Sequence, residues 1–260
     1  MNRRIHERLL GIAAVLVAAS LWGTTGTAAT FAPEVGAVAI YPLAFYASMR
    51  LAGVTIGTVV SIGSAPLLSA LIETRLEGLR LTRRWRVGAG LGLAGMLLLG
   101  LAEGGGQVPD GTASGVIPGV LLGLLAGLTY ALYSWTARRL MQRGIAPRAA
   151  MGATFGMGGL LLMPVLMLTG APLLASWGNA AVGAYMALVP MLLGYLCFGY
   201  GLARVAASTA TTITLFEPVV TAGLAVVIVG ERLPAMGWAG IALILACLVC
   251  ISAPVRTSPR

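Results

Sequence analysis

The sequence predicts an all-α membrane protein, a polytopic helical bundle, and three observations carry this prediction. Of the 260 residues, 58% are hydrophobic and only 10% are charged, whereas a soluble domain has about 25% charged residues. The mean hydropathy is +0.92. The apolar residues form long runs separated by short links that hold the arginines. Because one globular core of this length cannot bury so much apolar surface, we expect the lipid bilayer to surround most of the chain.

Nine apolar segments follow one another, and most are long enough to cross about 30 Å of hydrocarbon at about 1.5 Å per residue. They cover roughly residues 9–31, 36–53, 55–73, 87–102, 115–137, 149–169, 180–203, 207–229 and 235–253. The first is too long for the core of a signal peptide and has no clear cleavage site after it. We therefore expect it to be retained as a helix.

Composition also argues against several other classes of function. The net charge of +9 is compatible with nucleic-acid binding, but the arginines lie between apolar runs, so we expect no nucleic-acid partner. Cys197, Cys247 and Cys250 lie within apolar runs and are interpreted as small hydrophobic residues. His6 is the only histidine, so we expect no metal site, no cofactor, no catalytic residues and no enzymatic activity. The sequence has no phosphate-binding loop, which argues against ATP as an energy source.

The arginine positions predict the orientation, because positively charged loops stay in the cytoplasm. The link 73–86 holds five arginines and the link 138–148 holds four, so both are predicted to be cytoplasmic. The link 103–114 has two acidic residues and no arginine, and the link 170–179 is uncharged, so both are predicted to face outward. From residue 55 to the end of the chain, these charges fit one alternating topology.

The N-terminal part does not fit this topology. If residues 36–53 cross the membrane, the first helix must end inside, and Arg3, Arg4 and Arg8 must lie outside. One more crossing near residues 32–36 would remove the conflict, but this stretch is too short to supply it. We therefore expect that one helix of a ten-helix parent is missing here, through a deletion, a natural truncation or a stretch absent from the numbered sequence. The alternative is that the first helix inserts against its charges.

An internal echo predicts two halves, 1–110 and 111–260. Residues 50–66 resemble residues 204–218, and each stretch leads to a Glu/Arg/Leu patch, at Glu73 and at Glu231, followed by a tryptophan and a glycine-rich helix. The two copies have opposite predicted sidedness, which is typical of the inverted repeats of transporters. A chance similarity between helices rich in Ala, Gly, Leu and Val is the alternative.

Short motifs in a specific order give the chain a resemblance to a known family. Ala18-Ala-Ser-Leu-Trp-Gly-Thr24, Glu217-Pro218 and Gly230-Glu-Arg-Leu-Pro234 resemble the drug/metabolite transporter superfamily, EamA type. Tyr41-Pro-Leu-Ala-Phe-Tyr46 and Gly57-Thr-Val-Val-Ser-Ile-Gly-Ser-Ala-Pro66 resemble the YddG-type bacterial amino-acid exporters within it.

The resemblance implies inverted five-helix repeats, with ten spans in the family against nine counted here. It also implies cytoplasmic termini, a multi-pass location in the bacterial inner membrane, and export of amino acids or related small metabolites by alternating access. Family members carry a second helix after a stretch matching residues 32–34. The alternative reading is a structural or assembly membrane protein without transport activity. The sequence makes no prediction of the oligomeric state.

Polar and aromatic residues within spans are expected to face the bundle interior or a cavity. Glu217 lies near the middle of residues 207–229, where a buried carboxylate tends to be protonated or paired. It either handles a substrate amine or a proton, or it makes a structural hydrogen bond beside Pro218, which interrupts the helical ladder. The residues expected to line a substrate pathway are Trp22, Thr24, Tyr41, Phe45, Tyr46, Ser61, Tyr130, Ser134, Tyr195, Thr214 and Glu217.

Each aromatic residue in this set has ordinary core packing as its alternative role. Small residues at four-residue spacing also predict close helix packing. Such pairs occur at Gly53 and Gly57, at Gly123 and Gly127, and at Gly152 and Gly156.

Overall fold

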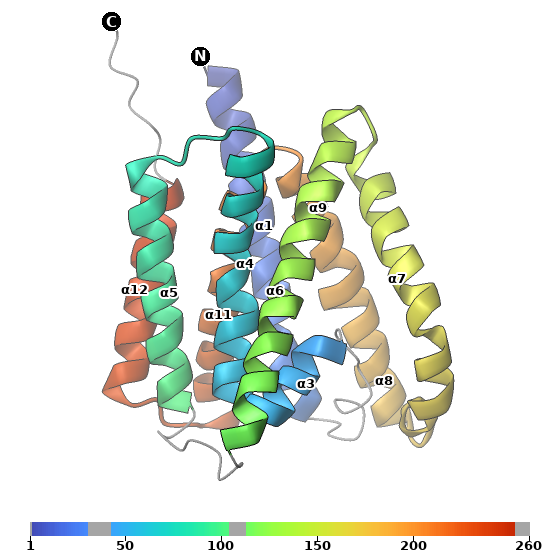
Figure 1. Ribbon diagram of the computed structural model, residues 1–260. Helices are drawn as coiled ribbons and strands as arrows, with labels where there is room; N and C mark the ends of the chain where they lie inside the picture. Colours follow the sequence, from blue (N-terminus) through green and yellow to red (C-terminus); the bar gives the residue numbers. More distant parts are fainter. Residues whose placement is uncertain (1, 31–42, 104–112, 253–260) are drawn as a thin grey trace, which may run out of the picture.

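The computed structural model describes residues 2–30, 43–103 and 113–252, and the regular elements in these residues are all helical (Figure 1). In chain order they are α1 (Asn2–Thr30), α3 (Leu43–Ala52), α4 (Val54–Leu76), α5 (Arg83–Glu103), α6 (Ala113–Gln142), α7 (Pro147–Thr169), the 3-10 turn η1 (Ala171–Leu174), α8 (Trp177–Met186), the π-helical turn η2 (Ala187–Leu193), α9 (Gly194–Leu202), α10 (Ala207–Ile213), the 3-10 turn η3 (Thr214–Phe216), α11 (Glu217–Leu224), the π-helical turn η4 (Ala225–Val229) and α12 (Ala235–Ser252).

Eight spans within the described residues are long and apolar enough to cross a membrane. Two of them are built from several elements, because α8, η2 and α9 form one span, and α10, η3, α11 and η4 form another. The predicted fold class, an all-α polytopic membrane bundle, is therefore confirmed.

The spans alternate in direction, and the start of α1 and the end of α12 lie at the same end of the bundle, the upper end in Figure 1. The connections α4–α5, α6–α7 and α9–α10 lie at this end as well. Arginine clusters lie in and beside the first two connections, and Arg204 lies in the third, so we call this end the arginine-rich end. The positive-inside rule predicts that this end faces the cytoplasm.

The helix α3 changes the interpretation of the N-terminal region. The described part of the predicted span 36–53 is a helix of ten residues, about 15 Å long, which is half the thickness of the hydrocarbon layer. Both α3 and the start of α4 lie at the end opposite the arginine-rich end (Figure 1). Arg8 lies at the arginine-rich end, where it contacts the last turn of α12, so the conflict that follows from counting residues 36–53 as a full crossing does not arise in the described residues. Residues 32–36, the predicted place of the missing helix, lie outside the described residues.

Glycines allow the helices around α6 to approach closely. A Cβ added at Gly123 would lie 2.8 Å from the Ser48 hydroxyl oxygen of α3, and one at Gly127 would collide with the Ser64 hydroxyl of α4. A Cβ at Gly57 of α4 would lie 2.7 Å from backbone atoms of Met49 in α3. The packing role predicted for these glycines is confirmed. Gly53, which joins α3 to α4, has a φ of 88°, a backbone conformation that favours glycine.

The final helices of the two predicted halves, α5 and α12, run antiparallel along their whole length (Figure 1). A Cβ at Gly95 would lie 2.6 Å from the Gly240 carbonyl oxygen, and a Cβ at Gly240 would lie 2.6 Å from the Gly95 carbonyl oxygen. The two backbones therefore touch directly at this crossing. Small residues make such close packing possible in a membrane, where hydrophobic burial does not drive helix association.

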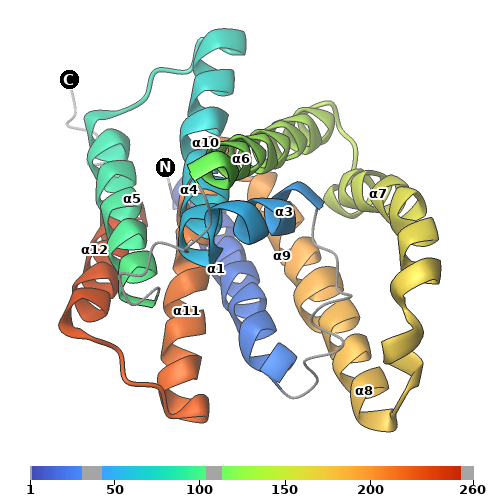
Figure 2. The same ribbon diagram turned by 60° about the horizontal axis from the view of Figure 1, so that its bottom comes forward.

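The helix α7 lies at the edge of the bundle in both views (Figures 1 and 2). Only 6% of its apolar stretch is buried inside the bundle, whereas 28% or more is buried in each of the other spans. A Cβ at Gly152 or Gly156 would meet nothing within 4 Å. The packing role predicted for this pair is therefore wrong within the described residues, because the two glycines lie on a helix with few neighbours.

Candidate functional site

The site begins with two interruptions in the helical spans. Pro190 lies at the middle of the span Trp177–Leu202, within the π-helical turn η2. Glu217 and Pro218 lie near the middle of the span Ala207–Val229, directly after the 3-10 turn η3. Proline has no N–H and breaks the regular ladder, so each interruption frees backbone groups inside the bundle. The helix break predicted from Pro218 is confirmed.

The helix α1 connects these two interrupted spans. The Trp22 indole Nε1 donates a hydrogen bond of 2.9 Å to the carbonyl oxygen of Pro190. On the next residue, the carbonyl oxygen of Gly23 accepts a hydrogen bond of 3.1 Å from the Thr221 hydroxyl of α11. A Cβ at Gly23 would lie 2.6 Å from the Val220 Cβ. Trp22 and Gly23 therefore fix α1 against both interrupted spans.

Six aromatic rings from four helices form one connected cluster, which we call the aromatic cluster. It contains Trp22 of α1, Tyr130 and Tyr133 of α6, Phe155 of α7, and Tyr195 and Phe198 of α9. The Trp22 ring centroid lies 4.9 Å from that of Tyr195 and 5.4 Å from that of Phe198. Tyr130 stacks on Tyr133 at 5.2 Å. These separations suit attractive ring–ring contacts, and phenol and indole groups add hydrogen-bonding capacity.

Hydroxyl and carboxyl groups of the second interrupted span lie beside this cluster. The Tyr130 hydroxyl donates a hydrogen bond of 3.0 Å to the Thr214 hydroxyl oxygen, and both residues are buried. Glu217 follows Thr214 by three residues and precedes Thr221 by four, so all three lie on one helical face. Glu217 is partly buried. Its backbone carbonyl oxygen lies 3.2 Å from the Thr221 hydroxyl oxygen and shares the hydroxyl proton with the Gly23 carbonyl oxygen. The carboxyl group thus lies on a helical face between a contact to α6 and a contact to α1.

Four of the residues expected to line a substrate pathway are brought together here, namely Trp22, Tyr130, Tyr195 and Thr214. Thr24 is linked to the same region, because the Tyr185 hydroxyl of α8 donates a hydrogen bond of 2.8 Å to its hydroxyl oxygen.

Other expected residues lie elsewhere. Ser61 is buried between α4 and α6, close to Gly123. Ser134 is buried on α6, one turn beyond Tyr130. Phe45 and Tyr46 belong to α3, which packs on α4 and α6. Tyr41 lies outside the described residues.

Sequence reasoning missed Phe155 and Phe198 as members of the cluster. Phe198 is fully buried and contacts both Trp22 and Tyr130. Its spacing of three residues from Tyr195 places both rings on one helical face, and this signal was present in the sequence. No comparable signal marks Phe155, because it is the lone aromatic residue of α7.

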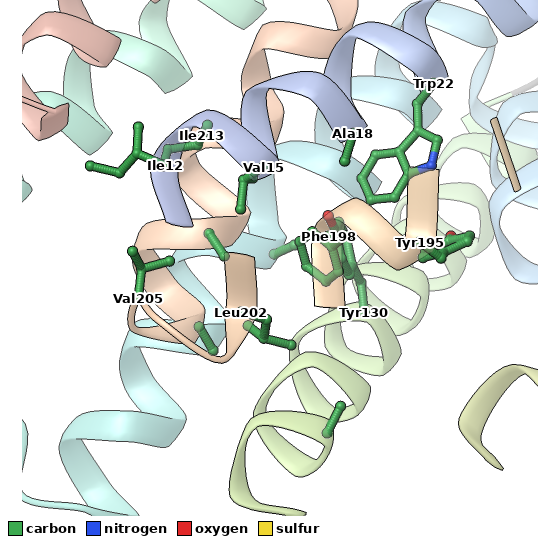
Figure 3. Packing of buried hydrophobic residues seen from close by; sticks show 14 of the residues in the cluster. Ile12, Val15, Ala18, Trp22, Tyr130, Tyr195, Phe198, Leu202, Val205 and Ile213 are labelled. Atoms are coloured by element: carbon green, nitrogen blue, oxygen red, sulfur yellow. The ribbon is translucent and has the colours of Figure 1, made fainter. Parts of the chain in front are cut away.

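Aliphatic side chains border the cluster on one side (Figure 3). Most of them come from the parts of α1, α9 and the α9–α10 connection that are nearest the arginine-rich end. Ile12, Val15, Leu202, Val205 and Ile213 come from α1, α9, the α9–α10 connection and α10, and each is at most 5% exposed. We call these five residues the aliphatic plug. Because the plug is fully packed, the aromatic cluster is separated from the arginine-rich end by several apolar side chains.

These features together describe a multi-pass helical membrane protein in which two spans are interrupted near their midpoints, beside an aromatic core. This is the architecture of secondary transporters. A family model described as the EamA-like transporter family matches residues 117–253. The chain belongs to this family, and the predicted EamA-type membership is confirmed.

Comparisons with individual proteins agree with this family assignment. The uncharacterized transporter YwfM of Bacillus subtilis is 30% identical over 284 aligned residues, which cover 93% of each protein. A probable terminal-alkyne amino-acid exporter of Streptantibioticus cattleyicolor is 26% identical over 196 residues, covering 74% of this chain and 62% of that protein. A solved crystal structure shares the fold with a TM-score of 0.65 and 20% identity, covering 94% of this chain and 97% of that one. The protein is therefore a small-molecule transporter.

Proposed function

We propose that this protein exports amino acids or related small metabolites across the bacterial inner membrane by alternating access. The observation that supports this most directly is the aromatic cluster beside two interrupted spans, with Thr214 and Glu217 on the adjoining helical face. Half-helices that end near the bilayer midplane are the usual binding elements of secondary transporters. The name of the Streptantibioticus relative points to the same class of substrate.

The two predicted halves, 1–110 and 111–260, fit such a mechanism. The family match at residues 117–253 falls inside the second half. The helix α4 runs toward the arginine-rich end, whereas its repeat partner, α10 with α11, runs away from it (Figure 1). The closing helices α5 and α12 are also antiparallel. This inverted relation supports an exchange of conformations between the two halves.

The chemistry of the site favours substrates with an apolar body and a polar end. Rings such as Trp22 and Tyr195 supply apolar contact, while the hydroxyls of Tyr130 and Thr214 supply hydrogen bonds. Glu217 supplies a carboxyl group that is suited to a substrate amine or to a proton.

Efflux from proteoliposomes that contain the purified protein tests this proposal. Amino acids with apolar side chains should leave the vesicles faster than from protein-free vesicles. Glu217→Gln keeps the size of the side chain and removes its charge, so it should lower the efflux rate. Full activity of this variant across the pH range would exclude a role of Glu217 in proton handling.

A structural or assembly role without transport is the second candidate, and one observation favours it. The alignment with YwfM spans 284 positions, which is more than the 260 residues of this chain. The relative therefore contains residues that have no counterpart here. A thermal-stability screen of the purified protein against a panel of amino acids distinguishes the candidates. A rise in the melting temperature with specific amino acids supports the transporter, whereas no shift with any of them supports the structural role.

A further inference from the structure

We propose that Glu73 and Arg138 form a latch that keeps the cytoplasmic end of the transport pathway closed. The latch consists of these two side chains and residues 204–208, which connect α9 to α10. The proposal rests on the proposed alternating access, because a closed end must open at some stage of that cycle.

Glu73 supplies the first half of the latch. Its side chain is fully buried near the end of α4. One carboxylate oxygen accepts a hydrogen bond of 2.7 Å from the Ala207 backbone N–H, and the other accepts one of 3.1 Å from the Ser208 backbone N–H. Ala206 is the N-cap residue of α10 and has no side chain that can cap the helix. Glu73 therefore caps α10 from another helix, and the free N–H groups of α10 stabilise its buried charge.

Arg138 supplies the second half. Its Nε donates a hydrogen bond of 2.7 Å to the carbonyl oxygen of Val205, which precedes Ala207 by two residues. Its Nη1 also lies 3.8 Å from Glu77, which follows α4. Glu73 thus holds the N–H side of the connection, and Arg138 holds its carbonyl side. Side chains from α4 and α6 therefore bind the same short connection, at Val205, Ala207 and Ser208.

The latch adjoins the aliphatic plug on its side nearest the arginine-rich end. Val205 belongs to both, because its carbonyl oxygen is bound by Arg138 and its side chain packs among the plug residues (Figure 3). Leu202 and Ile213 lie on either side of the connection in sequence. Displacing residues 204–208 therefore moves the plug. The plug cannot open while the hydrogen bonds of Glu73 and Arg138 to this connection persist.

The latch joins the predicted first half to the second. Glu73 belongs to residues 1–110, whereas Arg138 and residues 204–208 belong to residues 111–260. Arg204 adds a third tie, because its Nε donates a hydrogen bond of 2.8 Å to Glu7 of α1. Glu7 is half exposed, and a solvent-exposed ion pair contributes little. We therefore place the latch in the contacts of Glu73, which is fully buried, and of Arg138, whose side chain is 19% exposed.

The test measures access to a residue behind the latch. Thr211 is fully buried one turn into α10, so we use Thr211→Cys as the reporter after changing Cys197, Cys247 and Cys250 to alanine. A membrane-impermeant maleimide is added to inside-out vesicles, in which the cytoplasmic end faces the medium. Glu73→Gln and Arg138→Gln should each raise the labelling rate about tenfold, because each loses a charge-assisted hydrogen bond to a buried backbone group.

Arg139→Gln is the matched control. Arg139 neighbours Arg138 and lies 3.8 Å from Glu77, but its side chain is 45% exposed. Within the part of the chain that the structure describes, it forms no hydrogen bond or ion pair with residues 204–208. Its substitution should leave the labelling rate unchanged. If Glu73→Gln prevents folding, as judged by gel filtration in detergent, Arg138→Gln alone decides the outcome.

Unchanged labelling in a folded Arg138→Gln variant would overturn the latch. Equal labelling of the Arg138 and Arg139 variants would also overturn it, because it would indicate general loosening. Labelling needs no substrate, so a failure of the latch is distinct from a failure of the proposed function. A protein that exports amino acids with unchanged labelling refutes the latch alone.

Discussion

The Trp22 indole donates its hydrogen bond to the Pro190 carbonyl oxygen inside a π-helical turn. The donor, the Trp22 indole, lies on α1, which belongs to the other predicted half of the chain. The contact therefore supports an irregular backbone in the middle of a span, and it holds the Trp22 ring against Tyr195 and Phe198.

Trp22→Phe tests this relationship. The variant keeps an aromatic ring and removes the hydrogen bond to the buried Pro190 carbonyl oxygen, a loss of about 0.5–1.5 kcal/mol. We expect a lower melting temperature and slower efflux. Ser20→Ala is a suitable control, because its hydroxyl bonds only within α1, to the Leu16 carbonyl oxygen. Equal melting temperatures of the Trp22 variant and the wild type would contradict the structural role of the bond.

Tyr130 and Thr214 are expected to act as a pair. Tyr130→Phe and Thr214→Val each remove one hydroxyl of the hydrogen bond, and the double variant removes both. A double-mutant cycle on thermal stability should give a coupling energy of about 0.5–1.5 kcal/mol. If the pair also contacts substrate, efflux should fall more in Tyr130→Phe than its stability loss explains. A coupling energy near zero would show that the two hydroxyls act independently.

Much of the fold follows from the sequence, because lipid imposes a simple rule. Every backbone group in the hydrocarbon must be paired within the segment, so long apolar runs become helices. The predicted span 36–53 shows the limit of this rule, because its described part, Leu43–Ala52, is a helix of only ten residues. Hydropathy counts apolar residues and carries no information on whether a short helix crosses the membrane or stays at one end, as α3 does.

The candidate site was predictable only in part, and Glu73 shows why. The sequence singled out Glu217 because it lies near the middle of a span, where a carboxyl group costs free energy. Glu73 was interpreted as part of the arginine-rich link, yet it is fully buried. Its partners are backbone N–H groups of residues more than 130 positions away, and backbone groups leave no trace in the residue types. The internal repeat did single out Glu73 as the position equivalent to Glu231, but it gave no indication of the groups that Glu73 binds.

Gly127 and Gly156 should respond differently to the same substitution. At Gly127 an added Cβ collides with the Ser64 hydroxyl and lies 2.8 Å from the Ser61 carbonyl oxygen. Gly127→Ala should therefore push α4 from α6 and destabilise the protein by about 1–3 kcal/mol. At Gly156 nothing lies within 4 Å, so Gly156→Ala should leave the melting temperature nearly unchanged. A similar loss in both variants would contradict the packing of α6 described above.

The direction of α1 gives the last prediction. The structure places its first turn at the arginine-rich end (Figure 1), where Arg8 donates a hydrogen bond of 3.0 Å to the Ile251 carbonyl oxygen of α12. A cysteine at Asn2, in the background without native cysteines, should therefore resist an impermeant maleimide in intact cells. A cysteine at Ala175, in the connection between α7 and α8 at the other end, should react. Lysing the cells should make both reactive. Rapid labelling at Asn2 in intact cells would mean that α1 inserts against its charges, and that residues 36–53 cross the membrane after all.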